Sequence, residues 1–196
     1  MASSTADIGG HDPATWIDPP RRRDRSDLPF DPAAVARTDP IMLDTNVYID
    51  ALKKQLPASI ATLAASNPVF HSATAAGELA FTIGRLDPRD ARTADSVQAI
   101  GEVLERMRPD RTFAPSAAAW TEAAVIAGIC ARLHRYDAGA RRKLLLVALL
   151  FTSAAEHAAV LISRNIRDMD LLLRFRPTAR VLLYDRIAPT ARSAGP

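Results

Sequence analysis

Short apolar runs that alternate with longer stretches of helical character are the feature that most constrains how this chain can fold. Such runs occur in "IMLD", "NPVFHS", "AVLIS" and "RVLLY", and segments rich in alanine or leucine lie between them. Parallel strands cannot be joined by a tight turn and usually need a helix to cross between them. The alternation therefore predicts the α/β class, with a mainly parallel central sheet of about five strands.

The same pattern gives the expected elements. Strands are expected over residues 41–43, 69–71, 112–115, 159–163 and 180–184. Helices are expected over residues 47–55, 58–65, 73–86, 90–107, 116–132, 141–158 and 168–175. The first helix is expected to stop before Pro57, because the residue before a proline avoids the helical conformation.

The chain divides into three parts by composition. Residues 1–40 carry six of the fourteen prolines and the run "RRRDR", with almost no apolar periodicity, which predicts a flexible N-terminal arm rich in Pro and Arg. A solvated linker is the favoured interpretation of "RRRDR", and contact with phosphate is the alternative. Residues 41–187 are expected to form one domain, followed by a C-terminal tail over residues 188–196.

Composition excludes several classes of protein. The single cysteine, Cys130, rules out a disulfide framework, and no secretory signal pattern is present, so a cytoplasmic location is expected. The longest apolar run, residues 144–151, is eight residues long, far short of the roughly 20 that span a bilayer. A net charge of +3 and a pI of about 9.4 permit a nucleic-acid partner without requiring one.

Three acids stand where chemistry would be expected. Asp44 follows the first predicted strand and Asp168 follows the fourth, and ligands of parallel sheets collect at the carboxyl ends of strands. Glu78 lies among small apolar residues, where a carboxylate is costly unless a positive charge neutralises it. Converging acids of this kind predict a site for Mg²⁺ or Mn²⁺. Each acid also has a plain alternative: Asp44 and Asp168 can cap helices, and Glu78 can be a solvated helix residue.

Three motifs in order carry a resemblance to a known family. "LDTNVYID", "GELAF" and "LISRNIRDMD" are similar to the motifs of PIN domains, the fold of VapC-type toxin ribonucleases in bacterial toxin-antitoxin pairs. The resemblance covers residues 41–184 and implies a three-layer α/β/α sandwich, with Asp44, Glu78 and Asp168 as catalytic and metal-binding residues. It implies supporting roles for four polar residues, Thr45, Asn46, Ser163 and Asn165, and we expect Arg164 and Arg167 to hold substrate.

One residue departs from the family pattern. PIN domains usually carry a further Asp near the start of the helix before the last motif, and here Val147 occupies that position. Asp137 lies ten residues earlier, about 15 Å along a continuous helix, so it can substitute only if the chain folds back. Valine cannot bind a metal ion, and its presence leaves catalytic activity open.

Three functions remain after these observations. The first is a metal-dependent endoribonuclease that hydrolyses RNA, forms a homodimer and is held inactive by a cognate antitoxin, as the resemblance implies. The second is a catalytically impaired PIN domain that binds RNA or protein without cutting. The third is an α/β interaction module in which the acids are helix caps. No membrane partner is expected.

Overall fold

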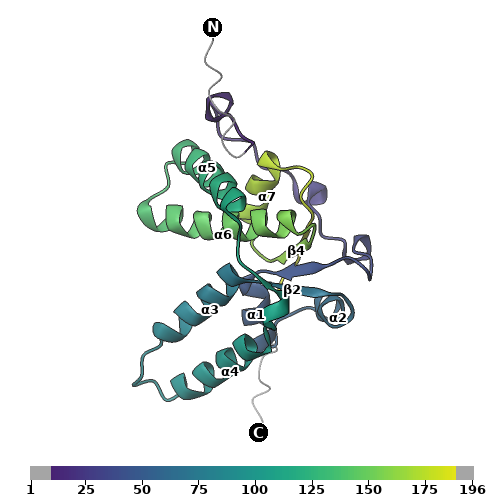
Figure 1. Cartoon of the computed structure of the whole chain (residues 1–196), viewed down its shortest axis with the longest axis vertical. Helices are drawn as coiled ribbons and strands as arrows, with labels where there is room; N and C mark the ends of the chain where they lie inside the picture. Colours follow the sequence, from purple (N-terminus) through teal and green to yellow (C-terminus); the bar gives the residue numbers. More distant parts are fainter. Residues whose placement is uncertain (1–9, 189–196) are drawn as a thin grey trace.

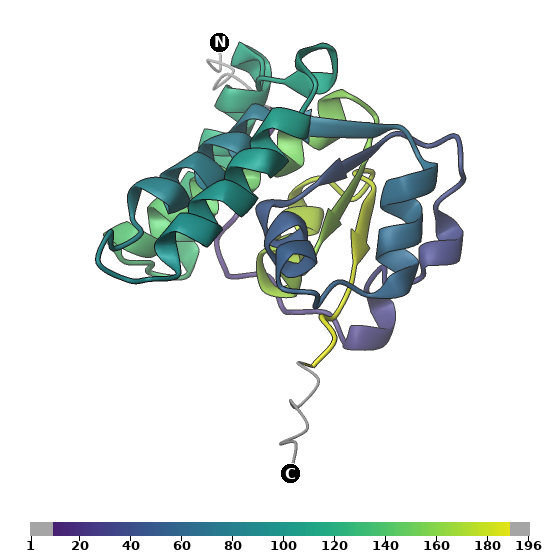
Figure 2. The same cartoon turned by 90° about the horizontal axis from the view of Figure 1, so that it is seen from below.

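The computed structural model describes residues 10–188, and its centre is a parallel sheet of five strands (Figures 1 and 2). The strands are β1 (Ile41–Leu43), β2 (Val69–Ser72), β3 (Thr112–Phe113), β4 (Val160–Ser163) and β5 (Val181–Leu183). Their order in the sheet is β3-β2-β1-β4-β5, and every neighbouring pair is parallel. The predicted α/β class and parallel sheet are confirmed.

Helices connect all of these strands. The longer ones are α1 (Thr45–Leu52), α2 (Ala58–Ser66), α3 (Ala73–Gly84), α4 (Thr93–Arg106), α5 (Ala117–Leu133), α6 (Ala138–Glu156) and α7 (Ile166–Phe175). Four helices start two or three residues away from the expected position: α1, α6 and α7 begin two or three residues earlier, and α4 begins three residues later. The side chain of Asp44 accepts a hydrogen bond from the Asn46 backbone, which starts α1 at Thr45, whereas Asp90 and Arg92 form a turn that delays α4 until Thr93.

The strand order has a switch point between β1 and β4. From β1 the chain moves to β2 and β3 on one side, and it then crosses to β4 and β5 on the other side. Leu43 and Ile162 are paired at the ends of β1 and β4, so the loops after these two strands leave in opposite directions from neighbouring positions. A switch of this kind opens the sheet edge to ligands in α/β proteins.

Each face of the sheet buries its own hydrophobic core. Met42 and Leu161 contact a core built with α5, α6 and α7, whereas Ile41 and Ile162 contact a second core built with α1 to α4. Successive side chains of a strand point to opposite faces, which explains why neighbouring residues join different cores. Helices thus cover both faces, and the predicted three-layer α/β/α sandwich is confirmed.

Residues 10–40 run along the surface of the sandwich. Trp16 stacks on Phe175 at the end of α7 with ring centroids 4.0 Å apart, and Arg23 forms an ion pair with the buried Asp170 at 2.7 Å. The backbone N–H of Leu183 in β5 donates to the carbonyl of Pro29. The flexible arm of residues 1–40 remains a prediction, and its first nine residues lie outside the described part, as do residues 189–196 of the predicted tail.

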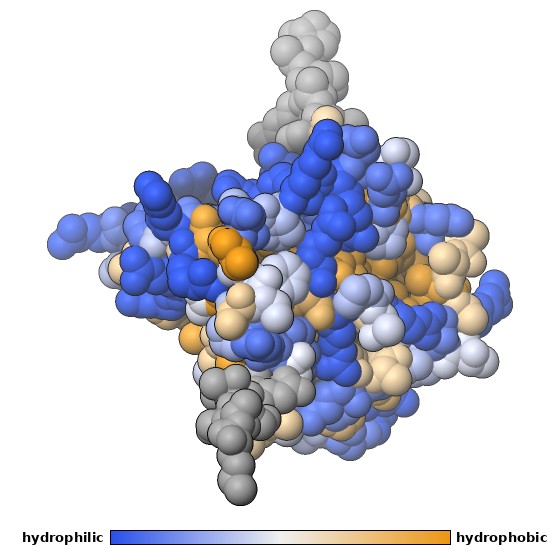
Figure 3. All heavy atoms as spheres, turned by 90° about the horizontal axis from the view of Figure 1, so that it is seen from above, coloured by the Kyte–Doolittle hydropathy of each residue, from blue (hydrophilic) through white to orange (hydrophobic). Residues whose placement is uncertain are grey.

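The surface agrees with a chain that buries its apolar residues inside. Figure 3 shows a face on which hydrophilic side chains predominate and small hydrophobic patches lie between them. No helix within residues 10–188 combines the length and the apolar character that a bilayer span requires.

Candidate functional site

Asp44 directly follows β1 and caps α1, at the switch point of the sheet. Its side chain is only 5% exposed. Two side chains donate hydrogen bonds to its Oδ2 atom, the Asn46 amide at 2.6 Å and the Ser163 hydroxyl. The pKa of Asp44 is raised to about 6, because burial and the negative charge of Glu78 raise it by more than the Ser163 hydrogen bond lowers it. Asp44 therefore caps a helix, as the alternative interpretation predicted. It is also a buried acid close to a second acid.

Glu78 reaches the same place from α3. The Thr45 hydroxyl donates a 2.5 Å hydrogen bond to the Oε2 atom of Glu78, which fixes this carboxylate beside the start of α1. Because Thr45 directly follows Asp44, this hydrogen bond brings Glu78 of α3 close to Asp44 at the end of β1. Glu78 is half-buried, so it is not the fully solvated helix residue that the alternative interpretation predicted.

A hollow of about 360 Å³ contains both acids. It is lined by Asp44, Thr45, Asn46, Ile49, Glu78, Lys143, Val147, Arg164 and Asn165. Val147 of α6 thus lies beside the two acids, at the position that the family pattern assigns to another acid, and it is 8% exposed. Asp137 caps α6 by accepting a hydrogen bond from Ala140. It does not line the hollow, so the fold-back that it would need is not seen.

Lys143 is a residue of the hollow that sequence reasoning missed. It lies four residues before Val147, a spacing that places two helical residues on the same face. That spacing was the available signal, once Val147 had been assigned to the site. Lys143 adds a positive charge to a hollow with two carboxylates.

Asp168 lies beside this hollow without lining it. It is half-buried in the first turn of α7, and its Oδ2 atom accepts a 2.8 Å hydrogen bond from the Asn165 side chain. Burial raises the pKa of Cys130 in α5 to about 12, and the negative charge of Asp168 adds to this effect. Among residues 10–188, no three His, Cys, Asp or Glu side chains lie close enough together to hold one metal ion.

The structure therefore brings together two of the three predicted acids. Asn165 links the third to the hollow, since it lines the hollow and donates to Asp168. The role of Asp168 as a metal ligand stays a prediction.

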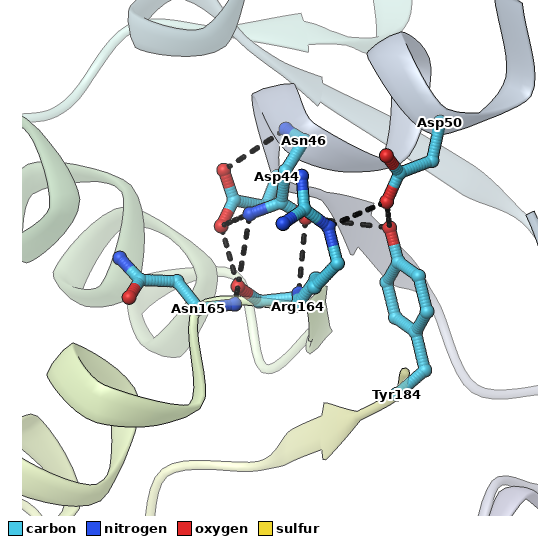
Figure 4. Close-up of polar contacts among 7 residues, drawn as sticks. Asp44, Asn46, Asp50, Arg164, Asn165 and Tyr184 are labelled. Atoms are coloured by element: carbon cyan, nitrogen blue, oxygen red, sulfur yellow. Dashed lines mark hydrogen bonds and ion pairs between the residues drawn. The ribbon is translucent and has the colours of Figure 1, made fainter. Parts of the chain in front are cut away.

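A partly buried ion pair, between Asp50 and Arg164, supports the polar residues of the site (Figure 4). Asp50 of α1 is 1% exposed, and its Oδ2 atom accepts hydrogen bonds from Arg164 Nε at 2.6 Å and from the Tyr184 hydroxyl at 2.9 Å. The backbone N–H of Arg164 donates to Asn46 Oδ1 at 3.0 Å, and Asn46 in turn donates to Asp44. The pair thus fixes the loop that holds Asp44.

This pairing bears on the two arginines expected to hold substrate. The Arg164 side chain is 35% exposed and engaged with Asp50, so only part of its guanidinium faces solvent. Arg167 is exposed, and its backbone carbonyl accepts a hydrogen bond from Arg22. Contact of either arginine with substrate stays a prediction. Asp50 itself was missed, although an acid between the apolar residues of a short helix was a usable signal.

The donor atoms of the hollow fit a hard divalent cation. Ionised carboxylates are oxygen acceptors only, and two of them share one small space with an Asn side chain. Mg²⁺ binds proteins through one or two carboxylates and keeps several waters for its other positions. The negative charge of Glu78 contributes to the raised pKa of Asp44, and a cation beside both carboxylates would offset this repulsion.

Solved structures with a similar fold were found. VapBC2 from Rickettsia felis bound to a DNA fragment from its promoter has a TM-score of 0.51 and 17% identity, covering 74% of this chain and 99% of that chain. FitAcB from Neisseria gonorrhoeae has a TM-score of 0.52 and 16% identity over 72% and 96% of the two chains. FitAB bound to the IR36 DNA fragment has a TM-score of 0.50 and 16% identity over 73% and 94%.

Comparison by sequence gives no corresponding match. No family model matches the chain, and no curated protein matches it significantly. The structural likenesses, at 16% and 17% identity, show the fold and assign no residue roles.

Proposed function

We propose that this chain, which has the VapC-like PIN fold of the toxin-antitoxin structures above, is a metal-dependent endoribonuclease that hydrolyses phosphodiester bonds of RNA. The observation that carries the proposal is the pairing of Asp44 with Glu78 in one hollow at the switch point of the sheet. Perturbed acids in a concave site are a recognised sign of a functional centre.

Asp44 would hold Mg²⁺ or Mn²⁺ directly, and Glu78 would do so directly or through a water molecule. An ion held there would supply a water of lowered pKa and would offset negative charge on the phosphate oxygens. Because the pKa of Asp44 is about 6, its carboxylate is ionised and available at neutral pH. Asp168 completes the proposed acidic set through Asn165, which it contacts.

Neighbouring polar side chains hold these acids in place. Ser163 and Asn46 donate to Asp44, and Thr45 donates to Glu78, so neither carboxylate rotates freely. Lys143 brings a positive charge to the hollow, where it would attract a phosphate. Val147 supplies no oxygen, which favours one metal ion over two.

The partners are part of the proposal, and the toxin-antitoxin structures with a similar fold support an antitoxin among them. A cognate antitoxin protein would occupy the acidic hollow, and the active form would be a cytoplasmic homodimer. RNA is the proposed substrate, since the chain is basic overall and the hollow combines acids with a lysine.

A second candidate function rests on Val147. A PIN domain that lacks one acid and whose described residues form no three-acid metal group would bind RNA or protein without cutting it. The loss of one ligand or supporting group in metal sites costs roughly 10- to 100-fold in affinity or activity, and more for a direct ligand.

One cleavage experiment separates these functions. The purified chain, stripped of any copurified protein, is incubated with single-stranded RNA in Mn²⁺, in Mg²⁺ and in EDTA, beside Asp44→Asn and Glu78→Gln. The control is Asp95→Asn, which removes an exposed acid of α4 outside the hollow. Cleavage that requires the metal and is lost only in the hollow variants supports the endoribonuclease. RNA binding without cleavage supports the second function. If the chain shows no RNA binding and no metal-induced thermal shift, the result supports the interaction module.

A further inference from the structure

The acidic hollow opens into a larger groove between α3 and α6. This groove has a volume of about 780 Å³, and three residues line both spaces: Thr45, Glu78 and Lys143. Most of its lining residues belong to α3 and α6, and Trp120 of α5 lines it as well. The helix pairs α3–α4 and α5–α6 project together on one side of the sheet (Figure 1). A linear ligand in the groove would thus extend directly to Asp44 and Glu78.

Two exposed aromatic side chains line this groove. Phe81 of α3 is 63% exposed and Trp120 is 47% exposed, and both belong to the small set of large hydrophobic residues that the described chain leaves open to solvent. The guanidinium of Arg85 lies 5.7 Å from the centroid of the Phe81 ring. Exposed aromatic rings beside a polar site are costly in water and mark a surface that receives a ligand.

The charge of the groove is positive. Arg85, Arg142 and Lys143 line it against a single acid, Glu78, which belongs to the hollow. None of these three cations forms an ion pair within residues 10–188, and all three are exposed. The groove therefore offers unpaired cations together with aromatic rings, and it selects an anionic ligand that also has flat apolar faces.

Single-stranded nucleic acid combines these properties. Its bases stack on aromatic side chains whatever their sequence, and its phosphates pair with Lys and Arg. An apolar protein surface would cover Phe81 and Trp120 as well, but it would also bury Arg142 and Lys143 without partners, which is unfavourable. Continuity with the acidic hollow adds to the argument, because a strand in the groove places its next phosphate beside the acids.

We propose that the groove binds single-stranded RNA next to the phosphate held in the acidic hollow, with bases stacked on Phe81 and Trp120 and backbone phosphates paired with Arg142 and Lys143. This inference rests on the proposed function, since it names the part of the substrate that the same site recognises. Stacking is the reason for a preference for single strands, because the bases of a duplex are already stacked on each other.

The test measures binding without cleavage. A short fluorescein-labelled single-stranded RNA is titrated with the full chain in EDTA, and anisotropy gives Kd. Phe81→Ala and Trp120→Ala are each expected to weaken binding by about 5- to 100-fold, the equivalent of one lost base–aromatic stack. Trp120→Phe keeps an aromatic ring and is expected to retain most of the affinity. Arg142→Ala should weaken binding and reduce the salt dependence of log K by about one.

Matched controls come from elsewhere on the surface. Leu52→Ala removes an exposed hydrophobic side chain outside the groove, and Arg37→Ala removes an exposed cation outside it. Both are expected to leave Kd unchanged. Circular dichroism confirms that each variant is folded, and duplex RNA of the same length is expected to bind more weakly than the single strand.

Three results would overturn the proposal. The first is a wild-type chain that binds no single-stranded RNA, and the second is groove variants with the affinity of the controls. The third is a dimer, detected by sedimentation, that Phe81→Ala and Trp120→Ala dissociate while the affinity for RNA stays unchanged. This result would show that the groove binds a second copy of the chain. The outcomes remain separate from those of the cleavage assay. If RNA binding depends on the groove but no cleavage occurs, only the proposed endoribonuclease function is refuted. If cleavage occurs and the groove variants do not affect it, only the proposed RNA-binding role of the groove is refuted.

Discussion

Val147→Asp tests whether the acidic hollow is a metal site, because it introduces an acid at the position where the family pattern has one. Val147 is 8% exposed and lies beside Asp44 and Glu78, so the substitution removes a buried apolar side chain and adds a third negative charge. Loss of a buried valine costs about 1.5–3 kcal/mol. For a chain of this size, 1 kcal/mol corresponds to roughly 2–4 °C in Tm. In EDTA, the variant should therefore unfold about 3–12 °C below the wild type.

Metal should reverse this loss. A third oxygen donor is expected to tighten Mn²⁺ binding by about 10- to 100-fold, which adds about 1.4–2.8 kcal/mol of stability at a saturating concentration of the ion. The rise of Tm on adding Mn²⁺ should thus be larger in Val147→Asp than in the wild type by about 3–11 °C.

Differential scanning fluorimetry in EDTA and in Mn²⁺ measures both effects. Val147→Asn is the matched variant, because it has the size of aspartate without the charge. If Mn²⁺ stabilises all three proteins equally, position 147 does not belong to a metal site and the reasoning fails.

Three further predictions concern stability. The pKa of Asp44 is about 6 in the folded state against an ordinary 3.8, so the ionised carboxylate destabilises the folded protein above pH 6. This destabilisation decreases as the pH falls toward 4. Urea unfolding in EDTA should therefore show Asp44→Asn to be more stable than the wild type by up to about 3 kcal/mol at pH 7, with almost no difference at pH 4; an equal difference at both pH values would refute this. Asp50→Asn, which leaves Arg164 without its partner charge, should cost about 1.5–3 kcal/mol in the same assay, and a change below 0.5 kcal/mol, on the order of an ordinary surface substitution, would contradict it. Trp16→Ala, which removes the stacking on Phe175, should cost about 0.5–1.5 kcal/mol in addition to the lost buried area, and an unchanged stability would show that this stacking does not hold residues 10–40 to α7.

The layers of the fold could be predicted from the sequence because their signals are local. Each strand is a short apolar run and each long helix has its own periodicity and cap, as Ser116 shows by capping α5 where it was expected. The contacts of residues 10–40 could not be predicted in this way. They depend on single anchors such as Trp16 and Arg23, whose partners lie in α7 and leave no periodic pattern in the sequence.

The candidate site was predictable in part for the same reason. Asp44 and Glu78 lie in motifs that resemble a known family, and the structure places them in one hollow. The Asp50–Arg164 pair joins residues 114 positions apart, and nothing in either segment alone indicates the other. Lys143 enters the site only because α6 presents the same face at positions 143 and 147.

Direct binding of Mn²⁺ tests the central claim, that Asp44 and Glu78 form a cation site. Isothermal titration at pH 7 is carried out on the wild type, Asp44→Asn, Glu78→Gln and the exposed control Asp95→Asn. We predict saturable binding to the wild type and the control, and a loss of at least roughly 10-fold in affinity for each hollow variant. Equal affinity in all four proteins, or no binding to the wild type, would contradict the account.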